Sequence, residues 1–254
     1  MRRSVTELRS FYAAPLGRAV RTMVIRQLVN AWGDARELDV LGIGYTTPFL
    51  EPFRAKARRV VAAMPAAQGA EAWPIGAANL VCLADEYALP LPGAMFDRIL
   101  IVHGLEESTD PVALLAEGHR VLAPSGRAII AVANRNGLWA GAETTPFGHG
   151  RPFSRAQLET IVRDAGLEPC AWSRALYAPP WPALAPYAEL IEPAAAVVAP
   201  PFSGLILLEA IKQTFAVRPG RIRAPVARAA LRPAGALSAL RKQGLGKAND
   251  LRHS

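Results

Sequence analysis

The stretch that decides the fold is residues 82–134, which read CLADEYALPLPGAMFDRILIVHGLEESTDPVALLAEGHRVLAPSGRAIIAVAN. The apolar, β-branched run Arg98–Val102 predicts a buried strand. Asp110 and Pro111 have the order of a helix N-cap followed by proline at the first helical position. The run Ala128–Ala133 predicts a second buried strand. Strand, helix and parallel strand form a right-handed βαβ unit, so this stretch predicts a doubly wound, Rossmann-like α/β sheet.

The polar residues of this stretch come where the predicted strands end. Asp85 follows a short apolar run, His103 follows the strand at 98–102, and Asn134 follows the strand at 128–133. Ligands of doubly wound sheets bind at the carboxyl ends of the strands. The sequence therefore predicts a binding site at the edge that these three residues share.

The order of these residues resembles the second half of the class I S-adenosylmethionine-dependent methyltransferases, in particular the methyltransferase type 11 group. That family reads roughly D-A-E-x-L-P-F-P-x-x-S-F-D, an apolar strand, H-x-L-E-H, D-P, and a helix ending in R-V-L-K-P-G-G before the next strand. The chain supplies, in order and at that spacing, Asp85, Glu86, Ala88–Pro92, Phe96, Asp97, His103, Leu105, Glu106, Asp110, Pro111, Arg120–Leu122, Pro124 and Gly126.

The resemblance implies a seven-stranded sheet with helices on both faces and an antiparallel last strand. It also implies S-adenosyl-L-methionine as cofactor, with no metal. We expect the strands at residues 37–44, 58–64, 79–83, 98–102, 128–133, 167–178 and 204–211. Ser154 and Gln157 form a capping box that predicts a helix over 154–164, and residues 4–32 predict helices broken at Pro15.

The first half of the chain departs from the family pattern V-L-E-x-G-x-G-x-G. Gly44 is kept, but Gly42 stands where the family has an acid, and Thr46 and Pro48 replace two glycines. The family also places a ribose-binding acid at the end of the second strand, where this chain has Met64. A thioether cannot accept hydrogen bonds from two hydroxyls, and Glu71 lies too far along the sequence to be its equivalent.

The candidate site residues follow from the same resemblance. The cofactor side comprises Gly42, Gly44, Tyr45, Asp85, Glu86 and His103, with Asp85 accepting from the adenine amino group. A turn or helix cap is the alternative role for Asp85. The acceptor side comprises Tyr12, Trp139, His149 and Arg151. His149 is a candidate general base, since its pKa suits the task, or it only fixes its loop. Phe11 and Tyr12 pack either on the cofactor or in the core.

The positive charge belongs to the two ends of the chain. The net charge is +8, and residues 218–254 hold nine Lys or Arg against Asp250 alone. Residues 31–217 are net acidic, so the chain does not resemble a nucleic-acid-binding core. We predict a helical cap at 1–36, a methyltransferase-like domain at 37–217 with an insertion or lid at 179–202, and a disordered basic tail at 218–254.

That tail is predicted to act as an electrostatic tether to an anionic membrane or to nucleic acid, or else only as a solubilising segment. Cys82 and Cys170 lie in apolar segments and are expected to be core residues. With no long apolar run and no signal peptide, the sequence predicts a cytoplasmic protein. The predicted function is methyl transfer to an unidentified acceptor, either a small molecule or a protein. The alternative is a non-catalytic relative that serves as a binding or regulatory module.

Overall fold

The computed structural model describes residues 2–212, which lie within one compact unit. The predicted tail, and the last residues of the predicted domain, fall outside this range. The strands are β1 (Asp39–Gly44), β2 (Arg59–Pro65), β3 (Val81–Ala84), β4 (Phe96–Val102), β5 (Leu122–Ala133), β6 (Leu167–Ala175) and β7 (Leu205–Lys212). They form a single sheet in the order β3-β2-β1-β4-β5-β7-β6.

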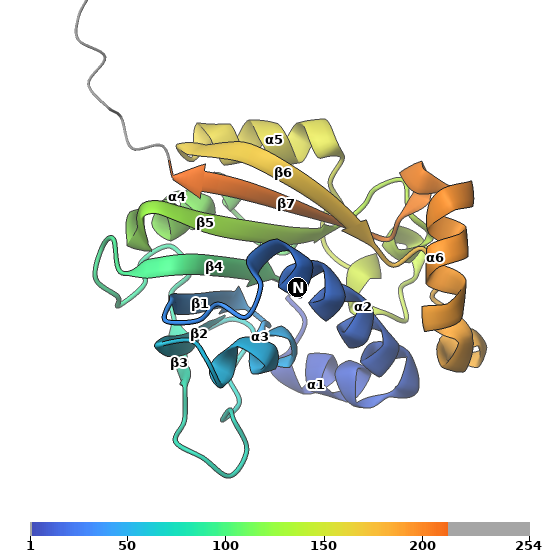
Figure 1. The fold of residues 1–254 in the computed structure, drawn as a ribbon, viewed down its shortest axis with the longest axis horizontal. Helices are drawn as coiled ribbons and strands as arrows, with labels where there is room; N and C mark the ends of the chain where they lie inside the picture. Colours follow the sequence, from blue (N-terminus) through green and yellow to red (C-terminus); the bar gives the residue numbers. More distant parts are fainter. Residues whose placement is uncertain (1, 213–254) are drawn as a thin grey trace, which may run out of the picture. The chain divides into compact units, whose positions relative to one another are not determined.

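The pairing confirms the predicted Rossmann-like sheet (Figure 1). Strands β1 to β5 pair in parallel, and β7 lies antiparallel between β5 and β6. The strand order reverses beside β1, which is the point where open α/β sheets bind ligands. The carboxyl ends of β1, β2, β3 and β4 all meet there.

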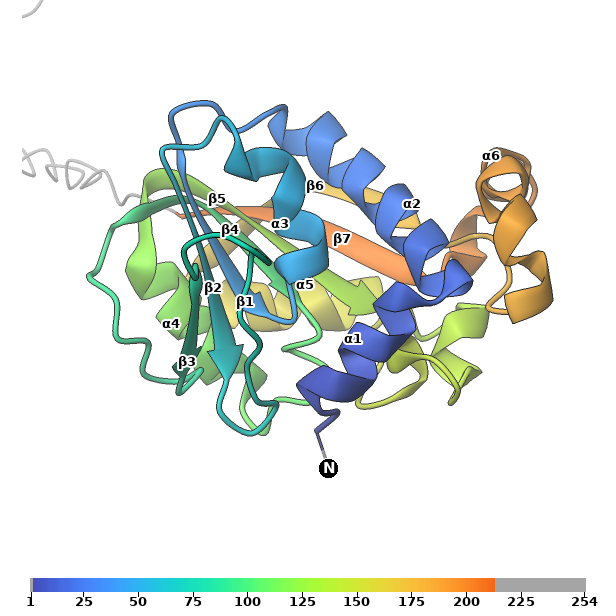
Figure 2. The same ribbon diagram turned by 90° about the horizontal axis from the view of Figure 1, so that it is seen from below.

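Two layers of helices cover the sheet (Figures 1 and 2). On one face, α1 (Val5–Ala13), α2 (Pro15–Trp32) and α3 (Thr47–Arg54) contribute to a core that contains Val20, Leu28 and Phe49. On the other, α4 (Pro111–Val121) and α5 (Arg155–Asp164) contribute to a second core around Leu114 and Leu158. The helix α6 (Ala188–Val198) lies at the end of the molecule, in contact with α2. Short 3₁₀ turns occupy Leu138–Gly141, Pro146–Gly148, Pro182–Tyr187 and Pro200–Phe202.

The predicted helix signals are confirmed. Ser154 and Gln157 form the capping box that starts α5, and the Asp110 side chain accepts from the Ala113 N–H at the start of α4. Pro15 separates α1 from α2, and a second capping box, Ser4 with Glu7, starts α1. Each box satisfies N–H groups that a helix leaves unpaired at its first turn.

Two strand boundaries differ from the prediction for identifiable reasons. Strand β5 begins at Leu122, because Leu122 pairs with Phe96 and the Pro-Ser-Gly stretch forms a bulge with Ser125 at φ 62°. Strand β6 stops at Ala175, because the Glu192 carboxylate accepts the N–H groups of the next three residues at 2.6–2.8 Å. Those amides are therefore satisfied by a side chain of α6 and not by a neighbouring strand.

The expectation that both cysteines are core residues is wrong for Cys170, which is exposed on β6, and Cys82 is only partly buried. Strand β6 lies at the sheet edge, so its side chains reach solvent. Within residues 2–212, no helix is both long and apolar enough to cross a membrane. No three His, Cys, Asp or Glu side chains gather as metal ligands in the same described part of the chain.

Candidate functional site

The centre of the carboxyl edge is Gly44, at the end of β1. Its φ is +90°, and a Cβ there would lie 2.3 Å from the Val102 carbonyl oxygen and 3.1 Å from the Gly104 nitrogen. Only glycine combines this conformation with so close an approach. The retained glycine therefore lets the β1 loop pass directly against the end of β4.

The other glycine of the loop has a different role from the expected one. A Cβ on Gly42 would lie 2.0 Å from Thr46 Oγ1 and 2.8 Å from Leu50 Cδ1, so Gly42 faces the start of α3. Thr46, which replaces a family glycine, fills that space. We therefore assign Gly42 to packing beneath the loop and not to a cofactor contact.

Tyr45 is held by a residue of the loop between β2 and β3. Its hydroxyl donates to Glu71 at 2.8 Å, and the Thr47 hydroxyl donates to the same oxygen at 3.3 Å. Burial, followed by this hydrogen bond, raises the pKa of Tyr45. Glu71, which is distant from β1 in the sequence, thus contacts the loop after β1. Tyr45, Glu71 and Trp73 line a hollow of about 440 Å³.

Met64, which stands where the family has its ribose-binding acid, is fully buried. The Met64 side chain is buried in the core beside α1 to α3, and its backbone pairs with Leu83. An acid introduced there would be a buried, unpaired carboxylate, which costs several kcal/mol. Met64→Asp is therefore expected to unfold the chain.

The ends of β2 and β3 form an open hollow of about 250 Å³. Pro65, Ala66, Ala84, Asp85 and Glu86 are among its lining residues. Asp85 is exposed, and its Oδ1 accepts from the Tyr87 N–H at 2.9 Å, as an aspartate in a turn does. The turn role proposed for Asp85 is present, and the carboxylate also faces the hollow where the resemblance places the adenine.

The N-terminal segment lies across the carboxyl edge. Arg2 forms an ion pair with Glu86, and its Nη2 donates to the Gly104 carbonyl at 2.9 Å. The Val5 N–H donates to the Gln68 carbonyl at 2.8 Å, and Gln68 Nε2 donates to the His103 carbonyl at 3.1 Å. These contacts tie the segment to the ends of β2, β3 and β4.

Four buried polar atoms near this edge have no hydrogen-bond partner: Arg2 Nε, Thr46 Oγ1, Gln68 Oε1 and Glu106 Oε2. Buried polar groups are nearly always paired. Unpaired atoms on four different segments mark a place where a polar ligand, or a rearrangement of the N-terminal segment, would satisfy them.

His103 is held at the end of β4 by aromatic neighbours. Its φ is 51°, Tyr12 Oη lies 2.6 Å from its Nε2, and its ring lies 4.9 Å from that of Phe147. Burial, and then the charge of Arg3, lowers the pKa of His103 to about 3, while burial raises the pKa of Tyr12. The Tyr12 hydroxyl and the neutral imidazole therefore share a hydrogen bond, and Tyr12 belongs to the core and to the cover over His103.

Glu106 was quoted in the sequence only as part of a motif, but it is the most unusual acid at this edge. It is buried, Oε1 accepts from the Ala133 N–H at 3.1 Å, and Oε2 has no partner. Burial raises the pKa of Glu106 to about 7. A small cavity joins Glu106 to His103, Arg3 and His149. A carboxylate with this pKa and one free oxygen can accept a proton near neutral pH.

The raised pKa predicts a pH-dependent gain from Glu106→Gln. The folded chain keeps Glu106 protonated up to about pH 7, whereas the unfolded chain releases this proton near the usual 4.5. Stability from the neutral acid is therefore present below pH 4.5 and is lost as the pH rises toward 7. The stability difference between variant and wild type should grow from near zero at pH 4.5 to about 3 kcal/mol at pH 7.

Urea denaturation at several pH values measures this difference and cancels the titration of all other groups. His103, with its lowered pKa, should give the opposite trend below pH 6.5 in both proteins. A difference that stays constant from pH 4.5 to 7 would show that Glu106 is ionised in the folded chain.

The residues predicted to line the acceptor side have different roles in the structure. Trp139 is buried and donates to the Ala178 carbonyl at 2.8 Å, so it packs in the core away from the hollows. His149 Nε2 lies 2.6 Å from the Glu143 carbonyl and also contacts Arg3, which favours the loop-fixing role. Arg151 meets the site through its backbone, whose N–H donates to the Glu106 carbonyl at 2.7 Å.

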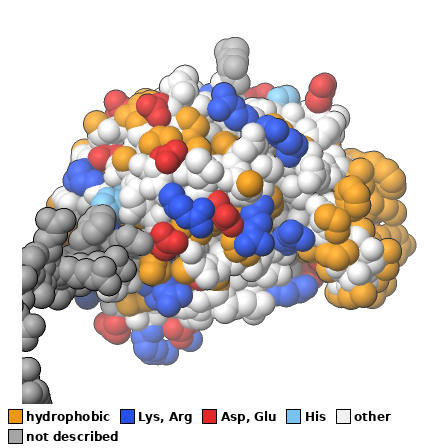
Figure 3. Space-filling view, turned by 90° about the horizontal axis from the view of Figure 1, so that it is seen from above, with side chains coloured by type: hydrophobic (Ala, Val, Ile, Leu, Met, Phe, Trp, Pro, Cys, Tyr) orange, Lys and Arg blue, Asp and Glu red, His pale blue; other side chains and the backbone are white. Residues whose placement is uncertain are grey.

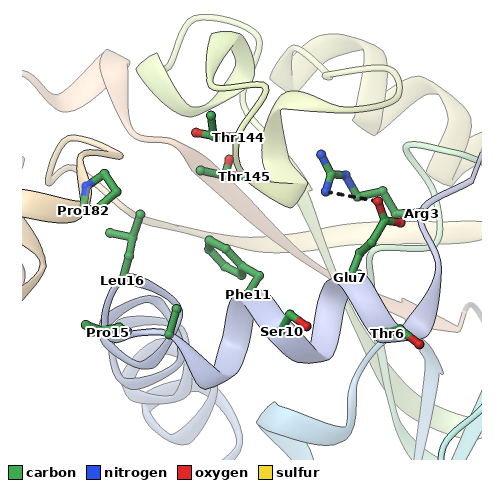
Figure 4. A pocket seen from close by; sticks show the side chains of 11 residues that line it. Arg3, Thr6, Glu7, Ser10, Phe11, Pro15, Leu16, Thr144, Thr145 and Pro182 are labelled. Atoms are coloured by element: carbon green, nitrogen blue, oxygen red, sulfur yellow. Dashed lines mark ion pairs between the residues drawn. The ribbon is translucent and has the colours of Figure 1, made fainter.

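A hollow of about 510 Å³ opens on the other side of α1 (Figure 4). Phe11, Ser10 and Glu7 of α1 line it from one side, while Thr144 and Thr145 face them from the loop after β5. Pro15, Leu16 and Pro182 close one end, and Arg3 lies at the other. Arg3 also borders the small cavity that reaches His103 and Glu106. The hollow is mainly apolar, with a polar end next to the carboxyl edge.

Comparison with known proteins agrees with this geometry. A sequence profile described as a methyltransferase domain matches residues 31–130. Among solved structures, an S-adenosylmethionine-dependent methyltransferase from Thermotoga maritima, described as a possible histamine N-methyltransferase, superposes with a TM-score of 0.57 at 19% identity. It covers 82% of this chain and 96% of that one. Residues 31–130 are therefore similar to a methyltransferase domain, and the chain has the fold of S-adenosylmethionine-dependent methyltransferases.

The other similar proteins match this chain at lower TM-scores or over only part of its length. A putative methyltransferase from Bacillus halodurans has a TM-score of 0.52 at 14% identity, covering 75% of this chain and 99% of that one. Burkholderia thailandensis 1,6-didemethyltoxoflavin-N1-methyltransferase, solved with its substrate and S-adenosylhomocysteine, has a TM-score of 0.50 at 20% identity, covering 79% of each chain. An uncharacterized protein of Mycobacterium tuberculosis is 30% identical over 108 residues, which is 40% of this chain and 38% of that protein.

The residues present fit one part of a family cofactor. The hollow beside Asp85 leaves room for an adenine, whereas Gly44 packs directly against the backbone that follows β4. Between these points, Arg2 and Gln68 occupy the edge. The site therefore fits the cofactor once the N-terminal segment moves off Gly104.

Proposed function

We propose that this chain is an active enzyme that transfers a methyl group from S-adenosylmethionine to a small, largely apolar acceptor. One observation carries the proposal: β1, β3 and β4 bring Gly44, Asp85 and Gly104 to a single edge, in a chain of methyltransferase fold and sequence. The Burkholderia thailandensis relative holds S-adenosylhomocysteine, which supports the same cofactor here.

The proposed roles of the residues follow from their positions. Asp85 accepts from the adenine amino group at the open hollow, and Gly44 and Gly104 let the backbone approach the methionine end without a side chain. S-adenosylmethionine, when bound, supplies a methyl group on a positively charged sulfur that needs only an aligned nucleophile. In this proposal the packed rings of His103 and Phe147 exclude water from one side of the reacting groups.

The acceptor enters, in this proposal, through the hollow beneath α1. Its apolar wall suits an acceptor with a hydrophobic body, and the polar end at Arg3 leads to the cavity beside Glu106. Glu106 then takes the proton that the nucleophile releases, because its unpaired Oε2 lies in that cavity and its pKa is about 7. His149 holds Arg3 and the loop in place.

Asp85→Ala tests the cofactor site. Calorimetric titration of wild-type protein with S-adenosylhomocysteine should show saturable binding, and the variant should bind about 10-fold more weakly, because the adenine amino group loses its charged acceptor. Asp164→Ala is the matched control, since Asp164 is an exposed aspartate at the end of α5. Equal affinity in wild type and Asp85→Ala would place the adenine elsewhere.

A non-catalytic binding module is the second candidate, and the filled edge favours it. The Arg2–Glu86 ion pair lies where the cofactor would pass, and Met64 replaces the ribose acid. The same titration separates the two functions. Absence of binding by wild-type protein at about 1 mM ligand, equivalent to a free energy weaker than about −4 kcal/mol, would favour the module.

A further inference from the structure

One end of the molecule exposes a continuous set of large apolar side chains. We call residues 181–202, which comprise the turn before α6, α6 itself and the turn after it, the apolar lobe. Six of its large hydrophobic residues are exposed: Trp181, Tyr187, Leu190, Val197, Val198 and Phe202, with Val198 at 84% and Leu190 at 78%. Figure 3 shows this lobe as the orange projection at one end of the surface.

From this surface we infer that the apolar lobe inserts into the surface of an anionic lipid bilayer. Monomeric proteins rarely expose so large an apolar patch without a partner. The lobe projects from the molecule in Figure 3 and is not hollowed, so a fluid bilayer fits it better than a rigid protein surface does. Trp181 and Tyr187 are of the two residue types most enriched where a membrane meets water.

The charges around the lobe suit an anionic surface. The lobe contains no Lys or Arg and two acids, Glu189 and Glu192. Glu189 pairs with Arg26 at 3.4 Å, and the Glu192 carboxylate turns inward to the backbone N–H groups after β6. Arg174 reaches the Pro200 carbonyl at 2.8 Å and borders the lobe. Among the described residues of the lobe, no unpaired carboxylate therefore faces outward to repel a lipid phosphate.

The remainder of the chain adds long-range attraction. The chain carries a net charge of +8, and residues 218–254 alone hold nine basic residues against one acid. Basic segments are attracted to anionic bilayers, and salt screens this attraction within about 10 Å at 0.1 M ionic strength. Apolar insertion is not screened in this way. The two contributions can therefore be separated by salt.

The lobe also adjoins the proposed acceptor entrance. Pro182 of the lobe closes one end of the 510 Å³ hollow, and Trp181 lines a smaller one beside the loop after β5. Docking through the lobe would place that entrance next to the bilayer surface. The docking itself is independent of methyl transfer, and its test uses no cofactor.

Vesicle flotation of the full-length chain tests the lobe. The vesicles contain equal parts of phosphatidylcholine and phosphatidylglycerol, and the variant is Val197→Ser/Val198→Ser, which changes no charge. Ile75→Ser is the matched control, because Ile75 is 96% exposed but lies in the loop after β2. We expect the double variant to partition about tenfold more weakly than wild type, and the control to partition within twofold of wild type.

Salt and self-association complete the test. At about 0.5 M salt the attraction of the basic segment is screened, so the difference between wild type and double variant should persist there. Equal flotation of both proteins at low salt would show that the basic segment acts alone and would overturn the inference. So would a wild-type dimer in sedimentation velocity that the double variant converts to monomer, because a second copy would then cover the lobe.

Discussion

Gly44→Ala should destabilise the chain by about 3–5 kcal/mol, or prevent its folding. The added Cβ would lie 2.3 Å from the Val102 carbonyl oxygen, and the φ of +90° is itself strained for alanine. The Val102 oxygen cannot move aside, because it ends β4 and accepts from the Tyr45 N–H at 2.9 Å. Urea denaturation or the melting temperature measures the loss, at about 2–4 °C per kcal/mol for a chain of this size.

Alanine variants of two other glycines distinguish the cost of the steric clash at Gly44 from the cost of its backbone conformation. Gly33 has a φ of +65° with nothing within 4 Å of its Cβ position, and Gly141 has open space with no positive φ. Gly33→Ala should cost about 1 kcal/mol from conformation alone, and Gly141→Ala should cost almost nothing. If Gly44→Ala loses no more than Gly33→Ala, the loop after β1 is not packed against β4 in solution.

Arg2→Ala should strengthen cofactor binding by about tenfold or more. The guanidinium of Arg2 holds the N-terminal segment over Gly104 and pairs with the buried Glu86. Removing one partner of a buried ion pair is strongly destabilising for the arrangement that contains it. The open arrangement becomes more populated, and the apparent affinity rises in proportion to the competent fraction.

Calorimetric titration with S-adenosylhomocysteine measures this gain. Arg36→Ala is the control, since Arg36 is an exposed arginine between α2 and β1 whose side chain pairs with Asp34. Weaker binding by a folded Arg2→Ala protein would mean that Arg2 holds the bound cofactor and does not block it.

The sequence predicted the sheet well because its signals are local. Each strand of the second half is a short apolar run. Asp110 and Ser154 mark helix starts through side-chain hydrogen bonds to the first turn, and Pro15 marks one through its fixed backbone angle. The end of β6 could not be predicted in this way. The three N–H groups that follow β6 are bound by Glu192, which lies 14 to 16 residues further along the chain.

The site was only partly predictable, because much of it depends on tertiary contacts. Asp85 follows β3 and Gly44 ends β1, and both were assigned to the cofactor side from the family resemblance. The roles of Arg2 and Gln68 arise from contacts with Gly104 and His103 that no local pattern encodes. Glu106 differs from the other acids in its burial, which the sequence does not show. Trp139 was assigned to the acceptor side by its loop, yet its ring turns into the core.

A crystal structure of the chain with S-adenosylhomocysteine tests the central claim most directly. The account predicts adenine in the hollow beside Asp85, the amino-acid end against Gly44, and Arg2 displaced from the Gly104 carbonyl. Ligand bound elsewhere, with Arg2 still paired to Glu86 and the N-terminal segment unmoved, would contradict it.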